Sequence, residues 1–77
     1  MKDALDQELT VGDVVSFIPK GKRLLVLGIV TGFTKLKVEI AYDVYQVHYL
    51  TIENIKDFDM DKLGVCQVFP IVVSKIK

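Results

Sequence analysis

The segment from Lys35 to Tyr42 alternates apolar and charged residues along its length, and this alternation restricts the fold more than any other feature of the chain. One face of an extended chain would carry Leu36, Val38, Ile40 and Tyr42, and the other Lys35, Lys37 and Glu39. Successive side chains of a β-strand point to opposite faces, so the pattern predicts a strand with one buried face. A chain of 77 residues has room for one core, so this strand belongs to a single small domain.

Four further strands are predicted where β-branched and aromatic residues lie between turn residues, at 13–19, 24–33, 44–50 and 65–73. Pro19 and Gly21 mark the turn after the first strand, and Pro70 places the last strand at an edge or a bulge. Within 51–64 the alternation is lost, and apolar residues recur every third position, which predicts a short helical or 3₁₀ segment: Ile52, Ile55 and Phe58. The expected fold class is all-β, a five-stranded antiparallel barrel with a helical turn before its last strand.

Residues 11–77 are expected to form this domain, preceded by an N-terminal extension of residues 1–10. Leu5 and Leu9 are four apart in the extension, which fits either a short amphipathic turn docked on the domain or a frayed end. Gly12 and Gly32 are expected where the backbone needs a positive φ or a close approach. The predicted core consists of the apolar members of the alternating strands: Val15, Phe17, Val30, Val38, Ile40 and Val47.

Three short motifs in the first half of the chain are characteristic of a known architecture. They are Val-Gly-Asp-Val-Val-Ser-Phe at 11–17, Gly-Ile-Val-Thr-Gly-Phe at 28–33 and Val-Glu-Ile at 38–40. Together they resemble the opening of small Src-homology-3-like barrels of the KOW and Tudor kind, over residues 11–73. The resemblance implies the five-stranded barrel and, as a function, association with nucleic acid. KOW members are usually basic, whereas this chain has a formal net charge of +0.

The sequence offers little for metal or catalytic chemistry. The acidic run 57–61 alternates like a calcium loop, but Lys62 stands at the position of the loop glycine and Val68 at that of its last glutamate. His48 and Cys66 are each single and lack the paired spacing of structural zinc ligands. A lone cysteine in an apolar strand is typical of packing rather than of nucleophilic catalysis. We expect no metal, no cofactor and no enzymatic activity.

Cysteine content and hydropathy also bear on location. Cys66 has no second cysteine to pair with, and the first residues resemble no secretory signal. The longest apolar run, 24–30, falls far short of the about 20 residues that a membrane-spanning helix needs. A cytoplasmic location and no membrane role are therefore expected.

An apolar surface and a tyrosine cluster are the first two candidate binding sites. Residues 24–33 are apolar on both faces, whereas a small barrel has one interior, so some side chains need cover from a second copy or another protein partner. These candidate interface residues are Leu25, Leu27, Ile29 and Phe33. The tyrosines are candidates for binding peptides or methylated side chains, or else for core packing. They are Tyr42, Tyr45 and Tyr49.

The third candidate surface is basic. Between Val14 and Val38 the chain has five basic residues and no acid: Lys20, Lys22, Arg23, Lys35 and Lys37. They indicate either a site for phosphates or an acidic protein, or ordinary solvated turns. We therefore expect a non-enzymatic binding module or accessory protein acting through protein–protein contacts, including contacts with itself. The alternative is a nucleic-acid-associated barrel that uses the basic loops, whose binding would fall steeply with salt.

Overall fold

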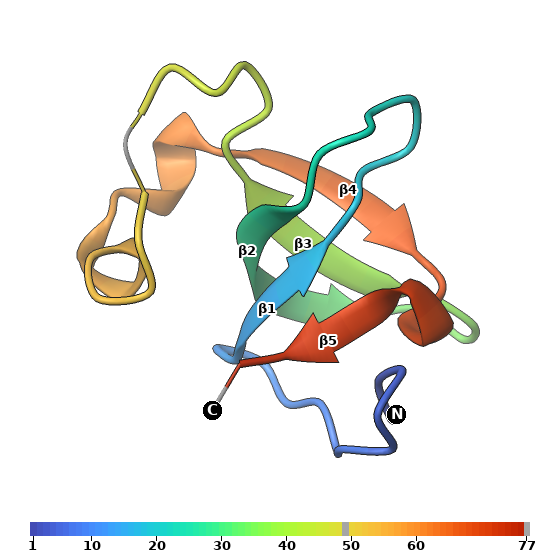
Figure 1. Cartoon of the computed structure of the whole chain (residues 1–77). Helices are drawn as coiled ribbons and strands as arrows, with labels where there is room; N and C mark the ends of the chain where they lie inside the picture. Colours follow the sequence, from blue (N-terminus) through green and yellow to red (C-terminus); the bar gives the residue numbers. More distant parts are fainter. Residues whose placement is uncertain (49, 77) are drawn as a thin grey trace.

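The computed structural model describes residues 1–48 and 50–76, which form five strands and three short 3₁₀ turns (Figure 1). In chain order these are β1 (Val14–Phe17), β2 (Val26–Phe33), β3 (Val38–Tyr42), η1 (Ile55–Asp57), η2 (Met60–Lys62), β4 (Gly64–Val68), η3 (Pro70–Val72) and β5 (Val73–Lys75). The strands form one antiparallel sheet in the order β4-β3-β2-β1-β5. The predicted class, an all-β domain of five antiparallel strands with a helical turn before the last one, is confirmed.

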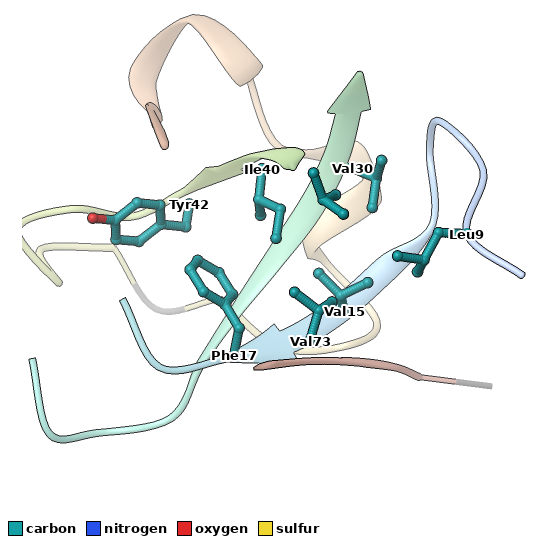
Figure 2. Close-up of a cluster of buried hydrophobic side chains, with 8 residues drawn as sticks. Leu9, Val15, Phe17, Val30, Ile40, Tyr42 and Val73 are labelled. Carbon is teal, nitrogen blue, oxygen red and sulfur yellow. The ribbon is translucent and has the colours of Figure 1, made fainter. Parts of the chain in front are cut away.

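The sheet bends around an inner cluster of buried side chains (Figure 2). Five of the six predicted core residues are fully buried there: Val15, Phe17, Val30, Val38 and Ile40. Leu9, Tyr42 and Val73 complete the cluster. The rings of Phe17 and Tyr42 meet edge to face with their centroids 5.3 Å apart, an arrangement that aromatic pairs favour. The alternation of β1 and β3 thus places one side of each strand against a common core.

An outer cluster covers the opposite face of the sheet. Val14 and Ile29 pair across β1 and β2, and Ile55 of η1 packs against them. All three are buried, and Leu50 and Ile76 pack at the margin of the cluster. The sequence correctly indicates that β2 is apolar on both faces. The chain itself covers the outer face at Ile29.

The described residues of the fourth predicted strand are 44–48 and 50; none of them is in a strand and 44–48 form a turn, so that strand assignment is wrong. The side chain of Asp43 accepts a hydrogen bond from His48 N–H (2.8 Å), and its carbonyl accepts one from Gln46 N–H (3.2 Å). Gln46 has a left-handed φ of 53°. Val47, predicted in the core, is 71% exposed. A carboxylate that binds nearby backbone N–H groups competes with strand pairing, which explains the difference.

The last predicted strand, 65–73, divides into β4, the η3 turn and the start of β5. Pro70 begins η3, where a fixed φ and a missing N–H fit the first position of a helical turn. The predicted helical segment between 51 and 64 is present as η1 and η2. Asp59 caps η2 by accepting a hydrogen bond from Asp61 N–H (3.0 Å). The acidic run therefore contributes a turn cap.

Residues 1–10 lie along β5 as an irregular segment (Figure 1) and adopt neither of the two expected conformations. Ala4 N–H donates to Val73 O (2.8 Å), and Leu9 N–H donates to Met1 O (2.8 Å), which closes the segment into a loop. Leu9 is buried in the inner cluster, whereas Leu5 is exposed. The N-terminal extension is thus an integral part of the domain.

The carboxylate of Asp3 holds this segment to β5. It is 6% exposed and accepts hydrogen bonds from Lys75 N–H (2.6 Å), Gln7 N–H (2.8 Å) and Leu5 N–H (2.9 Å). Burial acts to raise the pKa of Asp3, but the hydrogen bonds from the backbone of Lys75, Gln7 and Leu5 outweigh it and lower the pKa below its usual value. Asp3 is therefore a charged, hydrogen-bonded link between the two ends of the chain.

The glycine predictions hold at one position and fail at the other. Gly12 has a φ of 96°, as expected for its turn. Gly32 has no positive φ, and a Cβ there would come no nearer than 4.0 Å to the side chain of Glu39. The prediction that the backbone requires glycine at position 32 is therefore wrong. Gly28 has the close approach instead, because a Cβ there would overlap Ile40 across the β2–β3 pairing.

Candidate binding surface at one end of the sheet

Two loops leave the same end of the sheet (Figure 1). The strands are antiparallel, so the connection from β1 to β2 (residues 18–25) and the segment after β3 (43–48) both begin at this end. The first has an exposed turn at Lys20 and Gly21, where Gly21 has a φ of 79°. The second is the turn held by Asp43. These loops bring residues 18 to 30 positions apart in the sequence to one side of the domain.

Two adjoining clefts lie between and beside these loops. The first has a volume of about 290 Å³ and is lined by both loops, from Leu24 and Leu25 on one side to Gln46 and His48 on the other. The second, of about 390 Å³, extends from Tyr45 and other residues of the second loop to the start of β4. Asp43 and His48 line both clefts. The 43–48 turn is therefore the wall that the two clefts share.

Large apolar side chains surround these clefts and remain exposed to solvent. Leu24 and Leu25 are each 66% exposed, Val47 is 71% exposed and Tyr45 is 84% exposed. We call these four residues the loop-end surface. Scattered exposed apolar residues are normal, but four of them lining two adjoining clefts form a patch of the kind found at binding sites.

The 43–48 turn between the clefts is held by a hydrogen bond and by an aromatic contact. Besides the Asp43 hydrogen bond to the His48 backbone, the imidazole of His48 lies 4.8 Å from the ring of Phe58, centroid to centroid, at a tilt of 54°. Phe58 directly follows η1, whose Ile55 is anchored in the outer cluster. The turn that carries Tyr45 and Val47 is thus connected to the core.

The predicted basic patch is not a single patch. Lys20, Lys22 and Arg23 lie in the β1–β2 loop, next to Leu24 and Leu25. Lys35 and Lys37 lie in the β2–β3 turn, at the other end of the eight-residue β2. At about 3.3 Å per residue the two groups are separated by the length of that strand, on the order of 20 Å. The amine of Lys37 instead lies 5.0 Å from the centroid of the Phe69 ring.

The predicted tyrosine cluster also divides. Tyr42 is buried in the inner cluster, and burial, together with the negative charge that nearby Cys66 carries once it ionises, raises the pKa of its hydroxyl. Tyr45 is the most exposed residue of the loop-end surface. Tyr49 lies outside the described residues. Of the three, Tyr45 is placed where a ligand can reach it.

The predicted interface along β2 is not contiguous. Ile29 is buried in the outer cluster, and Leu27 is half-buried against it. Leu25 is exposed at the loop end of the strand, and Phe33 is partly exposed at the opposite end. The sequence identified Leu25 and Tyr45 but missed Leu24 and Val47. Both were assigned to predicted strands, Leu24 to 24–33 and Val47 to 44–50, whereas both lie in loops.

Cys66, the single cysteine of the chain, lines neither cleft. Cys66 is half-buried against the inner cluster, and burial raises the pKa of its thiol, the opposite of what activates a nucleophile. Within residues 1–48 and 50–76, no three acidic, histidine or cysteine side chains are grouped to hold a metal ion. The same residues contain no helix long and apolar enough to cross a membrane.

The fold and this surface define a small all-β domain with an exposed apolar site at one end. The model of a family described as a domain of unknown function (DUF7205) matches residues 1–60, and the chain belongs to that family. The matched region includes the N-terminal segment and the whole loop-end surface. No curated protein and no solved structure matches the chain.

Proposed function

We propose that this domain is a non-enzymatic binding module that docks a protein segment on the loop-end surface. The observation that carries the proposal is the exposure of Leu24, Leu25, Tyr45 and Val47 around two adjoining clefts. Burying such side chains at an interface is favourable by roughly 25 cal/mol per Å² of apolar surface before the costs of association. Each of the four is largely available for contact.

The charges beside the surface favour one kind of partner. Lys20, Lys22 and Arg23 precede Leu24 in the same loop, and no acidic residue occurs between Val14 and Val38. Complementary charge increases the rate and specificity of association. The proposed ligand is therefore a segment with apolar residues for the clefts and acidic residues for the β1–β2 loop. The alternative ligand, a nucleic acid, would use the same three cations.

The proposal is tested by selecting binders from a random 12-residue peptide library displayed on phage against the immobilised wild-type domain. We expect the selected peptides to combine apolar and acidic residues. Affinity should fall at least about tenfold in the double variant Leu25→Asp with Val47→Asp, because both changes place a charge in the apolar contact. Isothermal titration calorimetry with the synthesised peptides measures the change.

Leu36 provides the matched control, because it is 67% exposed, much like Leu25, but lies in the turn between β2 and β3. Leu36→Asp should leave peptide affinity unchanged. Selected peptides that are basic, or that bind the double variant as well as the wild type, would contradict the proposal. A fluorescent 12-nucleotide single strand, titrated at two salt concentrations, tests the alternative. Tight binding that weakens steeply with salt would favour nucleic acid instead.

A further inference from the structure

The outer edge of β4 has no hydrogen-bonded neighbour within the described residues. β4 pairs with β3 along five residues, and no hydrogen bond from residues 1–48 or 50–76 reaches its backbone from the other side. Figure 1 shows β4 with no strand beyond it. An edge strand directs part of its N–H and C=O groups outward, where another strand can pair with them.

The opposite edge of the sheet is occupied. Outward groups of β5 bind the N-terminal segment through the Ala4 to Val73 hydrogen bond and the Lys75 to Asp3 hydrogen bond. The sheet therefore offers one edge for pairing. A molecule with two such edges can form an open chain of copies, whereas a molecule with one can form a closed pair.

The composition of β4 lacks the features that prevent pairing between edges. Its residues Gly-Val-Cys-Gln-Val include no charge and no proline, and its register with β3 runs without a bulge. Charged side chains, prolines and bulges are the usual protections of an exposed edge. The outer face of β4 also presents Val65, which is 58% exposed and continues the apolar row formed by Ile29 and Ala41 across the sheet.

We propose that β4 pairs antiparallel with β4 of a second copy of this chain across a two-fold axis at Cys66. Cys66 is the middle residue of the strand, so this register overlaps all five residues. It sets Val65 of each copy opposite Gln67 of the other and brings Lys62 opposite Pro70, so no like charges meet. A parallel pairing would instead align Asp61 with Asp61 and Lys62 with Lys62. Like charges directly opposite each other destabilise a strand pair, so the antiparallel arrangement is favoured.

The proposed contact between the two β4 strands is short, so we expect it to be weak. Five residue pairs with one exposed apolar side chain on each outer face bury less than the roughly 800 Å² per partner of a standard interface. The pair therefore forms reversibly as the protein is concentrated. Sedimentation equilibrium of the wild type, from about 10 µM to 1 mM, should show the average mass rising from 8.7 kDa toward twice that value.

Two double variants test the register by charge. Val65→Lys with Gln67→Lys sets like charges opposite each other in both symmetric pairs and should keep the protein monomeric over the whole range. Val65→Glu with Gln67→Lys sets opposite charges there and should associate at least as well as the wild type, and in both variants the lysine substituted at position 67 faces Glu39 of β3. Both carry two substitutions at the same exposed positions, so the second is a control for folding. Equal association of the two variants would overturn the proposal, as would a wild type that is monomeric at 1 mM.

Hydrogen exchange of the unmodified protein gives a readout that needs no variant. Amide exchange within β4 should slow as the concentration rises, while exchange in the β1–β2 loop stays unchanged. Slowing confined to the loop-end surface would show that the copies associate there instead, and would overturn the β4 pairing. The Leu25→Asp variant, which is altered in the loop-end surface, should still associate through β4. This result would separate the pairing of two copies from the proposed binding of a protein segment.

Discussion

The two edges of the sheet differ in whether their outward backbone groups are hydrogen-bonded within the described residues. At β5, an irregular segment without strand structure supplies a donor at Ala4 and an acceptor at Asp3. At β4, the described residues, 1–48 and 50–76, supply neither. The difference shows that an edge needs hydrogen-bonding groups in the right places rather than a further strand. It also shows why residues 1–10, polar in sequence, are part of the fold.

The covered edge also carries part of the core. The segment that binds β5 inserts Leu9 into the inner cluster beside Val15 and Val73 (Figure 2). At the β4 edge, by contrast, Cys66 and Val68 pack only at the margin of that cluster, and Val65 is exposed. The β5 edge is therefore expected to be the more sensitive of the two to mutation.

Removal of residues 1–9 should have the largest effect, because it uncovers β5 and removes a core residue. Loss of a buried leucine side chain costs about 2–4 kcal/mol, and a domain of this size retains roughly 3–5 kcal/mol in total. The shortened chain should be largely unfolded at 25 °C by circular dichroism. Leu5→Ala in the full chain is the control and should change stability by less than about 0.5 kcal/mol. A cooperative melt of the shortened chain at the wild-type temperature would contradict the comparison of the edges.

Asp3→Asn should have the next largest effect. The amide keeps one acceptor oxygen but presents an NH₂ group to a backbone donor, either Lys75 N–H or the N–H groups of Leu5 and Gln7. Leaving a buried donor without an acceptor costs about 1–3 kcal/mol. Urea unfolding at pH 7 measures the loss, and Asp6→Asn, at an exposed position of the same segment, is the control.

The same residue predicts a dependence on acid. The folded pKa of Asp3 is lowered, so its contribution to stability is complete above the unfolded pKa of about 3.9 and is lost as the pH falls through the folded value. The difference in stability between the wild type and Asp3→Asn should therefore shrink as the pH is lowered from 6 toward about 2. A difference that stays constant over this range would show that the carboxylate charge is not what holds the segment.

The sequence predicts the middle of the sheet well and its surroundings poorly. In β1 and β3 the alternation of side chains agrees with one face against the inner cluster, and in β2 the apolar character of both faces agrees with Val30 in the inner cluster and Ile29 in the outer one. Residues 44–48 also alternate, but Asp43 binds the backbone of that turn, and alternation alone does not reveal this competition. Similarly, nothing local shows that Asp3 meets Lys75, which is 72 positions away.

The candidate site was predicted in pieces. Leu25, Tyr45 and the cations of the β1–β2 loop were each identified from their residue type, but they were assigned to three separate surfaces. The topology joins them, because β1 ends and β2 begins where β3 ends. It also separates Lys35 and Lys37 from the other cations. Residue type thus indicated which side chains are available for binding, and only the strand order shows which of them share a surface.

The smallest predicted effect is at β4 and compares one substitution at the two edges. Val73→Ala, at a fully buried position of β5, should cost about 2–3 kcal/mol, because it opens a cavity in the inner cluster. Val65→Ala, at the exposed position of β4, should cost less than about 0.5 kcal/mol when unfolding by urea is measured at low micromolar concentration. At that concentration the proposed pairing of two copies contributes nothing to stability, so the two values report on the isolated domain. If Val65→Ala costs as much as Val73→Ala under these conditions, β4 is covered within the single chain. The two edges would then be equivalent, and β4 would have no outward groups with which to bind a second copy.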